Sequence, residues 1–422
     1  MKIAIVAMGS RGDVQPYVAL GKALKAAGHE VRLITHENFE PLVTSHELTF
    51  CTMPGNVQAV VESPEMRALL EKGDFLAINA HASKLMKTVS IEWAKAGLVA
   101  CEGMDLLIGG VGGLTRALAE SFRIPMLEAY VFPYTPTTAF PAVLFPPWIS
   151  RWGGVVNWLS HHLARQIMWQ SFRKNDRRMR SHVLNLPAAP FFGPKPDSKL
   201  TPFPTLYGFS PSVIPKPADW KNTVVTGAWF LEAESDWTPP EALVNFLVQG
   251  AAPVYIGFGS MGGRNPEETA DLVLKAIGKT GQRAILQSGW DGLAIENLPE
   301  NVLIVDSVPH SWLFPQMAAV VHHGGAGTTA AGLRAGIPTI VIPFFGDQPF
   351  WGQRVADLGV GPAPIPRKQL TTDRLAQAIQ TGVSDPVMRR RSAELGARIQ
   401  AEDGIARVVE TIGSSGQKRR PQ

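Results

Sequence analysis

The residues best suited to chemistry lie in the stretch HHGGAGTTAAGLRAGIPTIVIPFFGDQ, which runs from residue 322 to residue 348. Two histidines follow a predicted apolar strand at 317–321, and a glycine-rich turn then leads into a segment with helical character. The first N–H groups of a helix have no intrahelical partner, and the helix dipole favours an anion there. The order strand, glycine turn and helix therefore predicts a phosphate site, to which His323 could add a donor or a positive charge.

Asp347 and Gln348 follow the next predicted strand, 337–342, and Pro343. From that place a carboxylate and an amide can hydrogen-bond the hydroxyls of a sugar attached to the phosphate. The alternative role for the pair is to cap the helix that starts near Phe350.

Two further segments offer groups for the same ligand. The stretch VYIGFGSMG at 254–262 is a strand that runs into Gly259 and Ser260, where the backbone can approach a diphosphate and the hydroxyl can donate. Trp290 follows another predicted strand and could line a nucleotide pocket. An ordinary strand-to-loop turn and a packed core tryptophan are the alternative interpretations.

The other chemically promising segment is MGSRGDVQP at the start of the chain, residues 8–16. Asp13 comes just after the first predicted strand, with Ser10 three residues before it. A carboxylate in this place can act as a general base. It is also a good N-cap for a helix predicted over 14–27, and the helix dipole would then keep its pKa low.

Alternating strand and helix signals surround these segments. Apolar runs such as Ile3–Met8, Glu30–Thr35 and Val254–Phe258 are separated by helical spacing. Such alternation predicts α/β architecture with parallel sheets, in which ligands bind beyond the carboxyl ends of the strands.

Composition narrows the class of protein. A chain of 422 residues with 45% apolar and 18% charged residues is globular and long enough for two domains. Two cysteines, Cys51 and Cys101, form no metal or disulfide pattern, which favours a reducing, cytoplasmic location. A net charge of +4 without a basic stripe does not indicate nucleic acid. We also expect no signal peptide and no membrane-spanning segment.

The opening segment 8–36 and the stretch 322–348, in this order along the chain, resemble family 1 glycosyltransferases. Within that family the likeness is greatest to sterol and lipid glucosyltransferases and to bacterial glycopeptide glycosyltransferases, while residues 55–220 match only loosely. The resemblance implies GT-B architecture, with two facing Rossmann-like domains and a cleft between them. We expect an acceptor domain at 1–215, a nucleotide-sugar domain at 216–413 whose last helices could return to the first domain, and a disordered tail at 414–422.

The resemblance also implies roles for single residues. It assigns His323 and Ser260 to the diphosphate, the backbone around Val308 to the uracil edge, and Asp347 and Gln348 to the sugar. His310 in the same segment as Val308 is expected to be structural. The full set of expected donor-binding residues is Gly259, Ser260, Trp290, Val308, His323, Gly325, Gly327, Thr328, Asp347 and Gln348.

Glycosyl transfer also needs a general base for the acceptor hydroxyl and groups that stabilise the UDP leaving group. Asp13 is the expected base, with Ser10 as helper, and His36 and His81 are the next candidates. No Asp-x-Asp metal motif occurs, so we expect no metal and no cofactor besides the UDP-sugar itself. The family implies inversion at the anomeric carbon.

The acceptor is harder to predict. Phe140, Phe145 and Trp148 lie in an apolar, proline-rich segment that suits a flat hydrophobic molecule. Residues 148–180 are rich in tryptophan and arginine, which fits either a peripheral membrane contact or a helix that covers the first domain with a solvated basic face.

Taken together, the sequence predicts an inverting, metal-independent transfer of a sugar, with glucose as first choice, from a UDP-sugar to a sterol, triterpenoid, polyketide or lipid hydroxyl. A UDP-sugar epimerase and a non-catalytic lipid-binding relative are the alternatives. An NAD-linked oxidoreductase is disfavoured, because Met8–Asp13 does not fit Gly-x-Gly-x-x-Gly.

Overall fold

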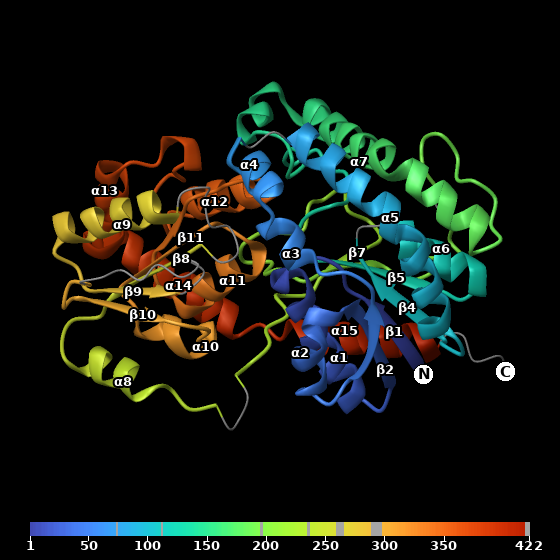
Figure 1. Cartoon of the computed structure of the whole chain (residues 1–422), viewed down its shortest axis with the longest axis horizontal. Helices are drawn as coiled ribbons and strands as arrows, with labels where there is room; N and C mark the ends of the chain where they lie inside the picture. The colour runs from blue at the N-terminus through green and yellow to red at the C-terminus, as the bar shows by residue number, and fades with distance from the viewer. Residues whose placement is uncertain are drawn as a thin grey trace. The chain divides into compact units, whose positions relative to one another are not determined.

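The chain forms two compact units, which Figure 1 shows with their elements labelled. The first comprises Met1–Val57, Leu76–Leu231 and Asp403–Gln422, and the second comprises Gln58–Phe75 and Glu232–Glu402. The structure, a computed structural model, describes residues 1–72, 75–110, 113–194, 197–233, 237–258, 266–287 and 298–417.

The first unit is built on a seven-stranded parallel sheet of order β3-β2-β1-β4-β5-β6-β7. Apolar side chains fill its central strands, in which every residue from Ile3 to Val6 is buried. The strands are β1 Lys2–Val6, β2 Glu30–His36, β3 Thr49–Met53, β4 Leu106–Gly109, β5 Met126–Tyr130, β6 Thr205–Tyr207 and β7 Thr223–Val225.

Strand order changes direction between β1 and β4, because the chain first adds strands on one side of β1 and then on the other. Ligands of open parallel sheets bind at such a switch point, beyond the carboxyl ends of the strands. The segment with Ser10 and Asp13 follows β1 directly and so lies at this switch point.

The helices of this unit are α1 Arg11–Ala26, α2 Glu40–Thr44, α5 Phe75–Cys101, α6 Gly113–Phe122, α7 Gly154–His182 and α15 Gly404–Gln417, with 3-10 turns η1 Glu37–Phe39 and η2 Pro147–Trp152. Helix α3 Val57–Glu62 begins in the first unit and continues into the second.

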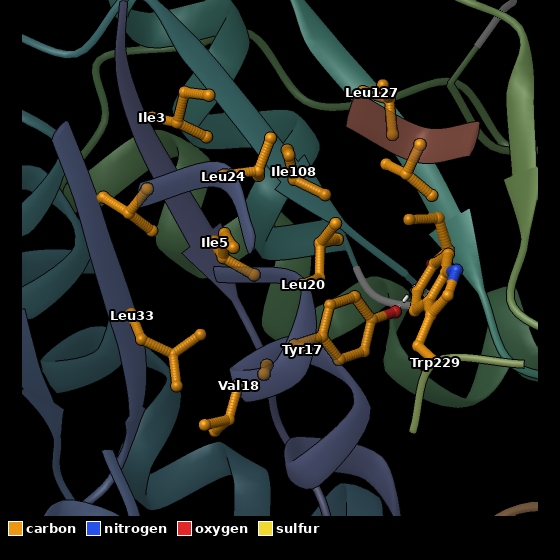
Figure 2. Packing of buried hydrophobic residues seen from close by; sticks show 14 of the residues in the cluster. Ile3, Ile5, Tyr17, Val18, Leu20, Leu24, Leu33, Ile108, Leu127 and Trp229 are labelled. Carbon is orange, nitrogen blue, oxygen red and sulfur yellow. Dashed lines mark hydrogen bonds between the residues drawn. The ribbon is translucent and has the colours of Figure 1, made fainter. Parts of the chain in front are cut away.

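The main core of the first unit joins both ends of the chain (Figure 2). Ile5 from β1 and Tyr17 from α1 pack with Trp229, whose ring meets the Tyr17 ring edge-on at 5.7 Å between centroids. Val408 and Ile412 of α15 are fully buried in the same cluster. The last helix therefore belongs to the first unit.

The second unit contains a five-stranded parallel sheet of order β10-β9-β8-β11-β12. Its switch point lies between β8 and β11, because β9 and β10 lie on one side of β8 and β11 on the other. The strands are β8 Val254–Gly257, β9 Ala284–Gln287, β10 Val302–Val305, β11 Ala319–His322 and β12 Thr339–Val341. Its helices are α4 Pro64–Lys72, α8 Glu241–Val248, α9 Pro266–Thr280, α10 His310–Leu313, α11 Ala326–Ala335, α12 Gln348–Asp357, α13 Thr372–Ser384 and α14 Pro386–Gln400, with 3-10 turns η3 Phe314–Gln316 and η4 Arg367–Gln369.

The unit boundaries differ from the expected ones. The change from first to second unit falls at Leu231, not at residue 215, because β7 completes the first sheet and Trp229 completes its core. Residues 58–75 belong to the second unit instead of the first. Helix α15 continues to Gln417, so the first residues of the expected disordered tail are helical. The polar composition of these residues favoured a disordered tail, but they continue a helix whose Ile412 is buried in the core.

None of the described helices is long and apolar enough to cross a membrane.

Candidate functional site

The predicted phosphate turn connects β11 to α11 at the switch point of the second sheet. Gly325 is the N-cap of α11 and has no side chain to occupy the free N–H groups of the first helical turn. A Cβ at Gly327 would meet none of the described atoms within 4 Å, so this side of the turn is open. The turn thus presents backbone donors and the positive end of a ten-residue helix.

Gly324 allows the turn to close. Its φ is +92°, a conformation that side chains disfavour, and a Cβ there would lie 2.6 Å from Val341 Cγ1. The same Cβ would lie 3.2 Å from the carbonyl oxygen of Gln348, so the turn runs directly beside the start of α12. The structure therefore brings the predicted phosphate and sugar residues together.

The two histidines have different surroundings. His322 is fully buried, and its Nδ1 accepts a hydrogen bond of 2.9 Å from the Gly324 N–H, so this ring holds the turn. His323 is half-buried at the turn, its Nδ1 has no partner among the described residues, and its Nε2 lies 2.7 Å from the Cβ position of Gly325. Burial lowers the pKa of His323 to about 4. With this pKa the imidazole is neutral at pH 7 in the unliganded chain, so of the two expected contributions, a donor or a positive charge, the donor needs no change of protonation state.

Asp347 and Gln348 are placed by α12. The Gln348 side chain is buried, and its Oε1 accepts hydrogen bonds from the backbone N–H groups of Phe344 (2.8 Å) and Phe345 (3.2 Å). Its amide nitrogen is the group left to donate to a ligand. Asp347 occupies the N-cap position but makes no capping bond with its side chain, which accepts from Trp351 Nε1 at 2.8 Å. The carboxylate is therefore oriented by an indole and not used to cap the helix.

The segment around Val308 is held by packing. The Val308 side chain is buried in a core cluster, which leaves only its backbone for a ligand. His310 begins α10, stacks on Phe314 with 4.2 Å between ring centroids, and lies 3.4 Å from the Tyr255 hydroxyl through Nε2. Tyr255 in turn donates to Gln287. His310 therefore sits in a structural network. Gly259, Ser260 and Trp290 lie outside the described residues.

In the first unit, Ser10 and Asp13 form the start of α1. The helix begins at Arg11, so Ser10 is its N-cap and Asp13 lies in its first turn, not at the N-cap as expected. Asp13 Oδ2 accepts from the Ser10 backbone N–H at 2.8 Å and from the Ser10 hydroxyl at 2.9 Å. Both hydrogen bonds run from Ser10 to Asp13, and they satisfy the backbone donor of the N-cap and fix the carboxylate.

The charge state of Asp13 follows from two opposing effects. Burial raises its pKa, and the hydrogen bonds from Ser10 lower it, with burial the larger effect. The pKa of Asp13 is therefore raised above the ordinary value, contrary to the low pKa expected from the helix dipole. A carboxylate with a raised pKa is a better proton acceptor than an ordinary one.

Sequence reasoning missed two residues that shape this site. Gly9 has a φ of +135°, and a Cβ there would lie only 2.4 Å from Asp13 Oδ2. Tyr17 lies one helical turn after Asp13, donates to the Ala129 carbonyl oxygen at 2.6 Å, and has its pKa raised by burial and by the Asp13 charge. The signals were local: a glycine directly before a Ser-x-x-Asp pattern, and an i,i+4 spacing.

The remaining candidates of the first unit have varied surroundings. His36 ends β2, is fully buried and packs against Trp93, which disfavours it as a base. Phe140 contacts His161 and Trp220. Phe145 is half-buried.

Trp148, by contrast, is 52% exposed and packs on Trp152. Phe140 therefore contacts rings inside the first unit, whereas Trp148 contacts another exposed ring. Among the described residues, no group of three or more His, Cys, Asp or Glu side chains could hold a metal ion.

Comparison with known proteins identifies the family. The model for the glycosyltransferase family 28 N-terminal domain matches residues 3–141, and that for the erythromycin biosynthesis protein CIII-like C-terminal domain matches residues 271–413. A sterol 3-beta-glucosyltransferase of Arabidopsis thaliana is 38% identical over 98% of this chain and 68% of its own length. The chain belongs to the sterol glucosyltransferase family. A sterol 3-beta-glucosyltransferase of Emericella nidulans is also 38% identical, over 98% of this chain, which spans 30% of the fungal protein.

Solved structures agree on the fold. The glycosyltransferase of kitacinnamycin has a TM-score of 0.68 at 20% identity and covers 98% of both chains. The calicheamicin glycosyltransferase CalG4 has a TM-score of 0.70 at 16% identity and covers 100% of this chain and 99% of its own. The predicted family resemblance and the predicted fold class, two parallel-sheet α/β domains of the GT-B type, are confirmed.

Proposed function

We propose that this family member transfers a sugar, with glucose as first choice, from a UDP-sugar to the hydroxyl of a hydrophobic acceptor. The observation that carries the proposal is the glycine turn at the β8–β11 switch point, where a helix N-terminus, His323 and Gln348 meet. Two sterol 3-beta-glucosyltransferases that are 38% identical along 98% of the chain support a sterol as first acceptor. Triterpenoid, polyketide and lipid alcohols are chemically related candidates.

The second unit would stabilise the leaving group. The N–H groups of the first turn of α11 and the helix dipole would face the diphosphate, whose charge increases as the glycosidic bond to UDP breaks. Fixed donors aimed at developing charge lower the barrier by several kcal/mol. His323 would take up a proton or share one with the diphosphate as that charge develops. Asp347 and Gln348 would hold the sugar hydroxyls.

The first unit would supply the base. Asp13 would accept the proton of the acceptor hydroxyl while the hydroxyl oxygen attacks the anomeric carbon. Ser10 would hold the carboxylate in place through the two hydrogen bonds that it donates. One displacement inverts the anomeric carbon, so an α-linked UDP-sugar would give a β-glycoside.

We further propose that the reaction needs no metal, since backbone donors and His323 would neutralise the leaving group. Full activity after exhaustive treatment with EDTA, with no increase on adding Mg²⁺ or Mn²⁺, would support this. A loss that divalent ions restore would contradict it.

The decisive experiment is a UDP-release assay with UDP-glucose and a panel of hydrophobic alcohols, with proton NMR of the products. We expect UDP release only with an acceptor, and the coupling of a β-linked anomeric proton. Epimerised UDP-sugar in the absence of acceptor would replace the proposal with an epimerase. Tight acceptor binding without any UDP binding would replace it with a lipid-binding role.

A further inference from the structure

Helix α7 of the first unit has its polar side turned inward and its apolar side turned outward. The inward side contains Asn157, Ser160 and His161, all buried. Asn157 donates to the Thr138 carbonyl oxygen at 3.0 Å, and the Ser160 hydroxyl accepts from the Ala142 N–H at 2.9 Å. The helix is thus attached to the domain by hydrogen bonds instead of by a hydrophobic stripe.

The outward side carries large apolar side chains at helical spacing. Val155, Leu159 and Leu163 follow one another at intervals of four residues and are 71%, 52% and 52% exposed. Trp152 of the preceding η2 turn is 65% exposed, and Trp148 and Trp158 are also exposed. We name these six residues the apolar ridge. Large exposed apolar side chains that gather on one side of a helix are typical of a binding surface.

The same outward side becomes basic further along α7. Arg173 and Arg177 lie on the same side of α7 as the apolar ridge, about three and four helical turns beyond Leu163, and Lys174 lies beside them. The only acidic residue of α7, Asp176, is buried. Helix α5 lies beside α7, and Arg178 of α7 donates to the Lys87 carbonyl oxygen (Figure 1). The exposed Lys84 and Lys87 of α5 therefore add positive charge next to the basic part of α7.

Two exposed phenylalanines lie beside this basic part. Trp169 and Gln170 donate to the carbonyl oxygen of Phe191 at 2.9 and 2.7 Å, which fixes the loop to α7. Arg173 lies over the Phe191 ring, and Phe192 is 81% exposed. The outward side thus combines tryptophans, aliphatic side chains, phenylalanines and cations, and in the part of the chain that the structure describes Arg173, Lys174 and Arg177 form no ion pair.

We propose that this side of η2, α7 and the Phe191–Phe192 loop docks on an anionic lipid bilayer. Tryptophan and basic side chains are the combination that prefers the interface between headgroups and acyl chains, and each cation near an anionic surface adds attraction. A second copy of this chain fits less well. An antiparallel pair would set the basic half of one α7 against the apolar half of the other, with no exposed carboxylate on α7 to match it.

The first test is co-sedimentation of the whole chain with vesicles. Vesicles of phosphatidylcholine with phosphatidylglycerol should bind the protein at low salt, and vesicles of phosphatidylcholine alone should bind it much more weakly. Raising the salt should release it, because screening acts on the cations. Failure of anionic vesicles to bind the unmodified chain at low salt would overturn the proposal.

Substitutions then locate the surface. The triple variant Arg173→Gln, Lys174→Gln, Arg177→Gln should bind anionic vesicles on the order of a hundredfold more weakly, from roughly fivefold per cation. Trp152→Glu with Leu159→Glu should abolish binding. Val248→Glu is the matched control, because Val248 is 76% exposed but belongs to α8 in the other unit.

Further measurements separate the remaining outcomes. Thermal unfolding and UDP affinity should be unchanged in all these variants, since none of the substituted residues is buried. Equal weakening by Val248→Glu would contradict a localised surface. One further outcome would overturn the lipid proposal and assign the surface to a second copy of the chain. In that case the unmodified chain would sediment as a dimer and bind no vesicles, and Trp152→Glu with Leu159→Glu would dissociate the dimer.

Discussion

At the scale of single residues, the first unit holds one carboxylate under tight geometric control. Asp13 is restrained by two hydrogen bonds from Ser10 and by the absence of a side chain at Gly9. Its pKa is raised because burial outweighs those hydrogen bonds. These effects can be changed one at a time, which makes the proposed base testable.

The substitution Asp13→Asn should lower kcat/KM by about 10²–10⁴-fold, because an amide cannot take up the proton of the sterol or other acceptor hydroxyl. UDP affinity should not change, since the donor residues belong to the other unit. Steady-state kinetics and calorimetry measure both quantities. A folded Asp13→Asn enzyme with near-normal turnover would remove Asp13 from the role.

The pH profile should report the Asp13 environment. Activity should rise with pH as Asp13 loses its proton, with an acid limb above the ordinary range of an aspartate. Ser10→Ala removes a hydrogen bond that favours the charged form, so the acid limb should move to higher pH. An acid limb that stays in place in Ser10→Ala would contradict this coupling.

Gly9→Ala should distort the site more than Gly12→Ala. A Cβ at Gly9 would lie 2.4 Å from the carboxylate at a φ of +135°, whereas one at Gly12 would approach only Ser10 Oγ at 3.7 Å. We expect a loss of about 1–3 kcal/mol in unfolding free energy and a large loss of kcat for Gly9→Ala. Denaturant unfolding and turnover that are alike in the two variants would contradict the packing argument.

His323 offers a direct probe of the donor site. Its pKa of about 4 reflects a neutral, partly buried ring in the unliganded chain. A bound diphosphate should raise this pKa toward neutrality, because the anion favours the charged imidazole. NMR titration of the histidines with and without UDP measures it, with His162 on α7 as the signal that should not change. An unaltered His323 titration at saturating UDP would place the diphosphate elsewhere.

At the scale of elements, the turn between β11 and α11 depends on one glycine more than on its neighbours. Gly324→Ala forces a Cβ to within 2.6 Å of Val341 at a φ of +92°, while Gly327→Ala adds a methyl group in open space on a helix. We expect Gly324→Ala to cost about 1–3 kcal/mol and to weaken UDP binding. Gly327→Ala should leave stability unchanged or raise it by about 0.4–1 kcal/mol.

Urea unfolding and UDP titration of the two variants compare these effects. Equal stabilities would show that the turn can rearrange around Gly324.

Helix α7 shows how an element can depart from the usual amphipathic arrangement. Its basic, tryptophan-rich sequence fits both a covering helix and a membrane contact. The hydrogen bonds of Asn157, Ser160 and His161 decide which side is turned inward. The apolar ridge is exposed as a consequence of those inward polar contacts.

At the scale of the whole molecule, the first unit is completed by the end of the chain. Ile412 of α15 is fully buried in the core that also contains Tyr17 and Trp229. Ile412→Ala should therefore lower stability by about 2–5 kcal/mol, while Ser414→Ala should change it by less than about 0.5 kcal/mol.

UDP affinity of Ile412→Ala at low temperature should remain normal, since the donor turn belongs to the other unit. Chemical unfolding and calorimetry provide the two measurements. Loss of UDP binding in a folded Ile412→Ala protein would contradict the independence of the units.

The sequence by itself determined the α/β class, the family and the glycine turn before α11. These rest on local patterns, because strand periodicity, a glycine turn and a helix start involve residues close together in the chain. The start of α1 was misplaced by three residues, since Ser10 and Asp13 are both good capping residues and only the hydrogen bonds distinguish them.

The tertiary structure alone decided the chemical state and the surroundings of these residues. It showed a neutral His323, a raised pKa for Asp13, a Gln348 carbonyl already used by the backbone, and the place of α15 in the first unit. The physical reason is that burial and desolvation depend on which distant segments surround a side chain. Burial and desolvation are not encoded in the few residues that flank a side chain in the sequence. The outward orientation of the apolar side of α7 likewise depends on the segments that α7 packs against.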